Sequence, residues 1–366
     1  MKAPSLREWK GRVGQELRWP LMGLSRFMTR PYAKEVELLE AYRGLVRQAY
    51  YAEFFQPWLC TDVFWKGAWC SPDRVPPTRS PARRERDNAV HHYGHDVLFK
   101  RYAGMPLVGR PLPFLLEHGV NFSDRSAFEV PDSWVRSYLC MGERRAELLR
   151  RNHGVAAHAL GPYIRYARSP LSQQRFDQIK QRLGRTLLVI PTHSTAQIRR
   201  IWSHEEWIAL VERHRRDQGY SSVLWMGFWK DPLPLDALPP GWIPAGNGHA
   251  SNPWFLDCQR LLFELSDAVC SCALGTHIGY ALELGLPVLF GRQPLIQDTS
   301  RTDELWRDRF HGELQERERL IDHLLADAGS GPLPLLNSDS ARRLLEPWFG
   351  FSQRVSSKRM RAILLG

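Results

Sequence analysis

The chain has 366 residues, which exceeds the size at which one hydrophobic core usually stops growing, so we expect two domains, with a single domain as the alternative. Because 43% of the residues are hydrophobic, the composition excludes a largely disordered protein, and no apolar run approaches the roughly 20 residues that span a bilayer. The formal net charge of +11 indicates a negatively charged partner: nucleic acid, anionic lipid or a phosphorylated substrate.

The first residues and the cysteines indicate a reducing compartment. Met1 to Ser5 lead into charged sequence without an apolar signal core, so we expect a cytoplasmic protein, free or held on the inner face of the cytoplasmic membrane. The six cysteines are scattered, and none has the paired spacing of a zinc site. We therefore expect reduced, mostly structural thiols.

Residues 1–57 predict a basic, amphipathic and helical N-terminal extension. Its apolar residues recur at helical spacing among basic ones, at Leu6, Trp9, Val13 and Leu17. Such a helix either lies on an anionic membrane or packs its apolar stripe on the protein, and the sequence leaves both open. Residues 346–366 form a second basic segment, a tail or a helix.

Residues 58–168 predict a first Rossmann-like domain, expected to bind the acceptor, which begins with a loop rich in Trp, Pro and Arg. The expected elements are strands at 114–116, 137–140 and 157–160, with a helix at 143–152. Gly154 stands where a left-handed cap would end that helix. The strand, helix and strand in succession predict a parallel sheet, with its chemistry at the strand ends.

Residues 169–345 predict a second Rossmann-like domain, entered through a polar helical segment. Its expected strands are 186–190, 223–226, 268–272 and 288–290, and its expected helices are 205–215, 253–265 and 277–284. The alternation of strand and helix restarts here, so the fold class is α/β with two domains.

The loop between the strand at 268–272 and the following helix suits a phosphate. Gly275 lets the backbone approach an anion, Thr276 offers a hydroxyl, and His277 adds a donor, or a positive charge when protonated. The unpaired N–H groups of the helix start point toward such a ligand. The alternative is an ordinary strand-to-helix turn with a threonine cap.

The sequence from Ser271 to Val288 resembles the donor-site loop and helix of bacterial GT-B glycosyltransferases, which build lipopolysaccharide and capsule. Residues 140–145 and 154–164 resemble the last βαβ unit of the N-terminal lobe of the same enzymes. The resemblance covers about residues 90 to 300. It implies two Rossmann-like lobes facing across a cleft, a nucleotide-sugar donor on the C-terminal lobe, and neither a cofactor nor an obligatory metal.

Further donor-binding residues follow from this resemblance and from strand ends. Besides Gly275, Thr276 and His277 they are Thr192, His193, Ser194, Gly227, Lys230, Glu283 and Arg292. For residues 192–194 the alternative is a helix-capping cluster. For Glu283, which would hold ribose hydroxyls, the alternative is a role in packing.

Glu117 and His118 are the expected catalytic residues, because an inverting transferase needs a general base for the acceptor hydroxyl. They follow an apolar strand and precede Gly119. This order resembles the acidic-Gly motif of some bacterial sialyltransferases, without its second acidic residue. His95 and Asp96 form a secondary polar pair for the acceptor or a second base, with a solvated loop or cap as the alternative.

The sequence thus predicts a metal-independent glycosyltransferase acting on a lipopolysaccharide, capsule or other lipid-linked glycan acceptor, with an anionic inner-membrane surface as a further partner. A GT-B-like sugar-nucleotide epimerase is the alternative enzyme. A nucleic-acid-binding protein would explain the positive charge without catalysis. No recognisable nucleic-acid-binding motif is present, so we expect no nucleic-acid partner.

Overall fold

The computed structural model describes the larger part of the chain from Val90 onward. The described residues are 90, 92–106, 112–126, 129–131, 135–193, 198–227, 238–246, 254–300 and 304–366. The predicted N-terminal extension, Ser194 and Lys230 lie outside them. Within the described residues, no helix has the length and apolar character needed to cross a membrane.

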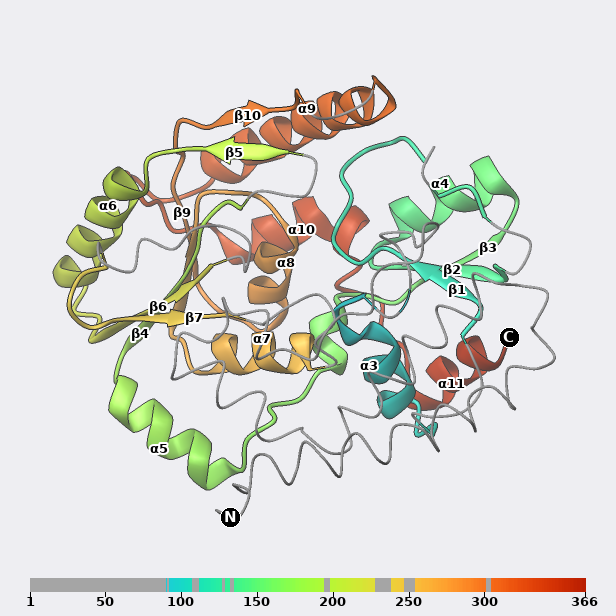
Figure 1. Cartoon of the computed structure of the whole chain (residues 1–366), viewed down its shortest axis with the longest axis horizontal. Coiled ribbons are helices and arrows are strands. Elements are labelled where there is room, and N and C mark those ends of the chain that lie inside the picture. The colour runs from blue at the N-terminus through green and yellow to red at the C-terminus, as the bar shows by residue number, and fades with distance from the viewer. Residues whose placement is uncertain are drawn as a thin grey trace, which may run out of the picture.

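The first sheet is parallel and has the strand order β1-β2-β3 in the described part of the chain. Its strands are β1 (Phe114–Leu116), β2 (Ser137–Cys140) and β3 (Ala156–Ala159). Helix α4 (Glu143–His153) connects β2 to β3 and ends at Gly154, whose φ of 65° is the predicted left-handed cap. The predicted βαβ unit is confirmed (Figure 1).

The second sheet is parallel and, within the described ranges, has the strand order β7-β6-β4-β8-β9. The strands are β4 (Thr186–Ile190), β6 (Ser222–Met226), β7 (Trp242–Ala245), β8 (Ala268–Ser271) and β9 (Val288–Phe290). The chain builds outward from β4 to β7 and then returns to place β8 on the other side of β4. This doubly wound order confirms the predicted α/β class and places a topological switch point between β4 and β8.

Helices cover both faces of the second sheet (Figure 1). Besides α4, the helices in the described part of the chain are η4 (His92–Gly94), α3 (His95–Tyr102), η5 (Tyr163–Tyr166), α5 (Gln173–Leu183), α6 (His204–Asp217), α7 (Phe255–Glu264), α8 (Thr276–Glu283), α9 (Glu304–Ala326), α10 (Ser338–Phe349) and α11 (Ser357–Leu365). Two short strands, β5 (Arg199–Ile201) and β10 (Ile296–Asp298), form an antiparallel pair.

Alternate residues of β4 point to different hydrophobic clusters, as the two-residue period of a strand requires. Leu187 and Val189 pack with Trp207 of α6, whereas Leu188 and Ile190 pack with residues of α7 and α8. The latter cluster continues into the first sheet and the C-terminal helices. One core therefore joins the two sheets.

The C-terminal segment packs against the first sheet. A Cβ at Gly142, the N-cap of α4, would collide with the main chain of Pro347 and Trp348, so only glycine allows this approach. A Cβ at Gly279 in α8 would overlap the ring of Phe349, so its small size brings α8 against α10 rather than against the sheet. Helix α11 then packs on α3 (Figure 1).

Two stretches differ from the prediction. Residues 242–245, for which no strand is predicted, form β7, and Pro244 is compatible with this strand because β7 is at the sheet edge. His95 and Asp96, whose alternative reading was a solvated loop, begin α3 and are buried.

Candidate functional site

The switch point brings two predicted loops together. Ligands of doubly wound sheets bind beyond the carboxyl ends of the strands at this point, which here means the loops after β4 and β8. Thr192 follows β4, and its backbone N–H donates to the sulfur of Cys272, 3.4 Å away, in the loop after β8. The predicted residues Thr192, His193 and 275–277 therefore lie at one edge of the sheet.

His277 is fixed by the end of β8. The Ser271 hydroxyl donates to the carbonyl of Ile190 at 2.8 Å, and Ser271 Oγ lies 2.8 Å from His277 Nε2. Burial lowers the pKa of His277 to about 4; a hydrogen bond with the backbone of Ala273 opposes this shift, and the charge of Arg317 adds to it. The ring is neutral at pH 7, so the predicted positive charge at this position is absent.

Two arginines that the sequence analysis did not single out supply the positive charge instead. Arg200 of β5 donates from Nη1 to Thr192 Oγ1 at 3.1 Å and to the carbonyl of His193 at 2.9 Å. Arg317 of α9 interacts electrostatically with both His193 and His277. Its buried Nε has no hydrogen-bond partner among the residues that the structure describes. With the start of α8, these groups make the edge electropositive.

The loop after β1 lies directly on the start of α8. The backbone N–H of Val120 donates to Thr276 Oγ1 at 2.9 Å, and a Cβ at Gly119 would lie 3.3 Å from the same oxygen. Thr276 Oγ1 thus accepts a hydrogen bond that connects the two sheets. Its own hydroxyl proton can be donated to a further partner. This contact brings the loop that carries Glu117 to the N-terminus of α8.

Glu117 is a partly exposed residue whose carboxylate is held by two backbone N–H groups. Oε1 accepts from Asn121 at 2.7 Å, and Oε2 accepts from Met141 at 3.0 Å. Burial raises the pKa of Glu117 to about 7, although the charge of Arg145 and both hydrogen bonds oppose the rise. A carboxyl that titrates near neutrality at a strand end has the protonation behaviour of a general base.

The other predicted residues of the first domain lie in an aromatic and buried region. The ring centroid of His118 is 5.5 Å from that of Tyr93, and Tyr93 also packs on Phe255 of α7 at 4.5 Å. His95 and Asp96 are 1% and 0% exposed. Burial raises the pKa of Asp96 to about 7, opposed by Lys100, its buried neighbour on α3.

Of the other predicted donor-binding residues, Gly227 follows β6, the neighbour of β4, and so stands at the same sheet edge. Glu283 lies at the opposite end of α8, where its Oε1 accepts from Arg165 Nε at 2.7 Å and Arg342 is 3.8 Å away. Exposed Arg292 pairs with Asp322 and Glu318 of α9. These ion pairs give Glu283 and Arg292 structural partners outside the loops at the switch point.

The described residues contain no group of three or more His, Cys, Asp or Glu side chains that would hold a metal ion. Metal independence remains a prediction, because a metal held jointly with a substrate would need fewer protein ligands.

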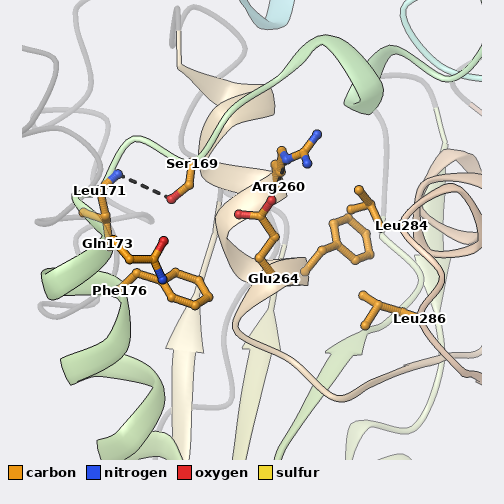
Figure 2. Close-up of a pocket in the computed structure, with 9 residues that line it drawn as sticks. Ser169, Leu171, Gln173, Phe176, Arg260, Glu264, Leu284 and Leu286 are labelled. Atoms are coloured by element: carbon orange, nitrogen blue, oxygen red, sulfur yellow. Dashed lines mark hydrogen bonds and ion pairs between the residues drawn. The ribbon is translucent and has the colours of Figure 1, made fainter.

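A cavity of about 510 Å³ lies away from this edge (Figure 2). Its lining residues are Ser169, Leu171, Gln173, Phe176, Arg260, Phe263, Glu264, Leu284 and Leu286. Phe263 and Glu264 come shortly before β8, and Leu284 and Leu286 come shortly before β9, so the cavity lies at the amino ends of these strands. The two charged residues of the cavity form an ion pair with each other, since Arg260 Nε donates to Glu264 at 2.6 Å. We therefore place the candidate site at the switch point.

No protein-family model matches the chain, and no curated protein matches it. One similar solved structure is Phytolacca americana UGT2 complexed with UDP-2fluoro-glucose and pterostilbene, at 12% identity and a TM-score of 0.24, over 63% of this chain and 48% of that one. Another is the spinosyn forosaminyltransferase SpnP, at 17% identity and a TM-score of 0.25, over 64% and 52%. The chain spans about half the length of both, and likenesses of this size assign it to no family.

Proposed function

We propose that the protein is a metal-independent glycosyltransferase of the GT-B type that uses a nucleotide-sugar donor. Its two sheets would belong to two lobes, divided near residue 168. The observation that carries the proposal is the position of Glu117. This carboxyl, with a pKa of about 7, belongs to the loop that contacts the start of α8 at an electropositive switch point.

The donor phosphates would bind where positive charge and N–H groups converge. The start of α8 provides backbone donors, and Arg200 and Arg317 provide guanidinium groups. Fixed dipoles and arginines stabilise a departing nucleoside phosphate without a cation. The nucleotide base would lie toward the ends of β6 and β7, the adjoining strands on one side of β4.

In the proposed transfer, the acceptor hydroxyl oxygen forms a bond to the anomeric carbon of the donor sugar. The bond from that carbon to the phosphate oxygen breaks, and its electron pair leaves with the nucleotide. Glu117 receives the hydroxyl proton, so it must be ionised when the reaction begins. The basic groups at the switch point stabilise the negative charge that develops on the leaving group.

Thermal unfolding in the presence of UDP, GDP, ADP and CMP tests this proposal. We expect one nucleotide to raise the unfolding temperature, because a ligand at 100 times its Kd stabilises by about 2.7 kcal/mol. The sugar nucleotides of that base are then assayed for transfer, hydrolysis and epimerised product. Failure to bind or turn over any of them would contradict the proposal. Epimerisation, or salt-dependent binding of random oligonucleotides alone, would favour the alternatives.

We further propose that the acceptor is a lipopolysaccharide, capsule or other lipid-linked glycan presented at an anionic membrane surface. Helix α11 supports this location, because it contains no acidic residue and exposes Lys358, Arg359 and Arg361. The positive surface continues to β3. Burial, followed by the charges of Arg359 and Arg150, lowers the pKa of His158 on that strand.

Reversing the charge of Lys358, Arg359 and Arg361 to Glu should abolish binding to vesicles that contain anionic lipid. Each basic residue near such a surface contributes about 1 kcal/mol. The matched control reverses three exposed arginines on α5 and α6, Arg175, Arg182 and Arg213, for the same change in net charge. Co-sedimentation at low and high salt compares the two variants. Equal loss in both would show that net charge, rather than α11, determines binding.

A further inference from the structure

Tyr280 carries a buried hydroxyl that the fold leaves without a partner. The residue is 1% exposed, and its OH has no hydrogen-bond partner within the described part of the chain. Buried phenols normally bond their hydroxyl to protein or to an ordered water, so an orphaned one marks the position of another polar atom.

The phenol lies on the side of α8 that faces the loop after β1. Tyr280 is four residues after Thr276 and so lies on the same helix face, and Thr276 accepts the Val120 N–H. Burial and the neighbouring Glu117 carboxylate raise the pKa of Tyr280 well above its usual value. The phenol therefore keeps its proton at neutral pH and remains a hydrogen-bond donor there.

Nearby hydroxyls are satisfied by the backbone, which singles out Tyr280. Tyr163 donates to the carbonyl of Leu139 at 3.0 Å, and this carbonyl also accepts the Glu117 N–H at 2.9 Å. Tyr166 donates to the carbonyl of Leu160. Glu117 has used one lone pair on each oxygen for Asn121 and Met141, and each oxygen keeps a second one.

We propose that Tyr280 and Glu117 hold one polar oxygen between them, a water before substrate binds and the acceptor hydroxyl during transfer. The second half of this statement rests on the proposed glycosyl transfer. The phenol donates to the oxygen, and the proton of that oxygen points to Glu117. A remaining lone pair of the acceptor oxygen is then directed at the donor sugar. Tyr280 is thus a positioning residue, and Glu117 receives the proton.

The test is Tyr280→Phe, which keeps the ring and removes only the hydroxyl. We expect kcat to fall about tenfold or more, with the KM for the donor unchanged. The acidic limb of the pH profile should move to higher pH, because the bridged carboxylate loses a stabilising donor. Carboxyl NMR of Glu117 in the substrate-free protein should show the same upward movement of its pKa. Tyr166→Phe is the control and should lower stability alone.

The two measurements separate failure of this inference from failure of the proposed function. If Tyr280→Phe leaves both kcat and the Glu117 titration unchanged in an active transferase, the inference is overturned. If the pKa of Glu117 changes in Tyr280→Phe but no sugar donor is turned over, the oxygen shared by Tyr280 and Glu117 is supported and the proposed glycosyl transfer is contradicted. A change in stability with no change in titration would also overturn it, because that is the result of a purely structural hydroxyl.

Discussion

Replacing Glu117 with Gln should lower kcat for the proposed glycosyl transfer by about 10² to 10⁴, the usual contribution of a general base. Glutamine matches the shape of glutamate but cannot take the acceptor proton. Its carbonyl can still accept the N–H of Asn121, whereas its NH₂ group would face the N–H of Met141. We therefore expect a further loss of about 1–3 kcal/mol in the free energy of unfolding.

The raised pKa of Glu117 determines the direction in which activity and stability change with pH. Because the pKa is raised from 4.5 to about 7 in the folded protein, activity should increase as pH rises through 7, where the base ionises. The folded state binds this proton more tightly than the unfolded state, so Glu117 reduces stability as pH rises from 4.5 through 7. The stability deficit of Glu117→Gln should therefore shrink between pH 5 and pH 8.

Rates across pH and denaturant unfolding at pH 5 and pH 8 check both statements. The control is Glu143→Gln, on the exposed start of α4, where the carboxylate pairs only with Arg150 at 2.7 Å in the described structure. It should leave the rate and its pH profile unchanged. A Glu117→Gln variant with wild-type kcat would exclude Glu117 as the base. Its role would then be to stabilise the loop after β1 through its two backbone hydrogen bonds.

Replacing Arg317 with Gln should weaken binding of the matching nucleoside diphosphate by about ten- to a hundredfold. A hydrogen bond to a charged group contributes about 1.5–3 kcal/mol, and 1.4 kcal/mol corresponds to a factor of ten. Arg317 has an ion pair with Glu313 at 2.7 Å and stacks over Phe122, yet its Nε is unsatisfied within the described residues. That donor is available for a phosphate oxygen.

Arg319, two residues further along α9, provides a matched control. It is exposed and pairs with Glu316 at 2.8 Å, so Arg319→Gln changes the same charge on the same helix without reaching the switch point. Calorimetric titration of both variants compares their Kd values, and thermal unfolding checks that each is folded. If nucleotide binding weakens equally in the two variants, the effect comes from net charge, and Arg317 does not contact the donor.

The α/β class and most strands of the two sheets could be predicted because their signals are local. The strand at 186–190 is a continuous apolar run ended by Pro191, and Gly154 ends α4 as predicted. The two halves of the site could be predicted separately, as polar residues after strands. Their contact through Val120 and Thr276 could not, because it depends on how two sheets pack.

The electrostatics of the site also depended on packing. Arg200 and Arg317 come from β5 and α9, and no motif distinguishes them from the many other arginines. His277 is neutral because it is buried, which a sequence does not reveal. The same holds for Glu283: an acidic residue in an apolar helix needs a cation, and Arg165 provides it from η5, 118 residues earlier.

The packing of the C-terminal segment on the first sheet sets the order in which the protein can mature during translation. Arg165 donates to the carbonyl of Phe351, 186 residues later, and the turn at Gly142 is covered by Pro347 and Trp348. When the first sheet leaves the ribosome, these covering residues have not been synthesised. Native packing of the first sheet is therefore completed only after the C-terminal segment has been synthesised.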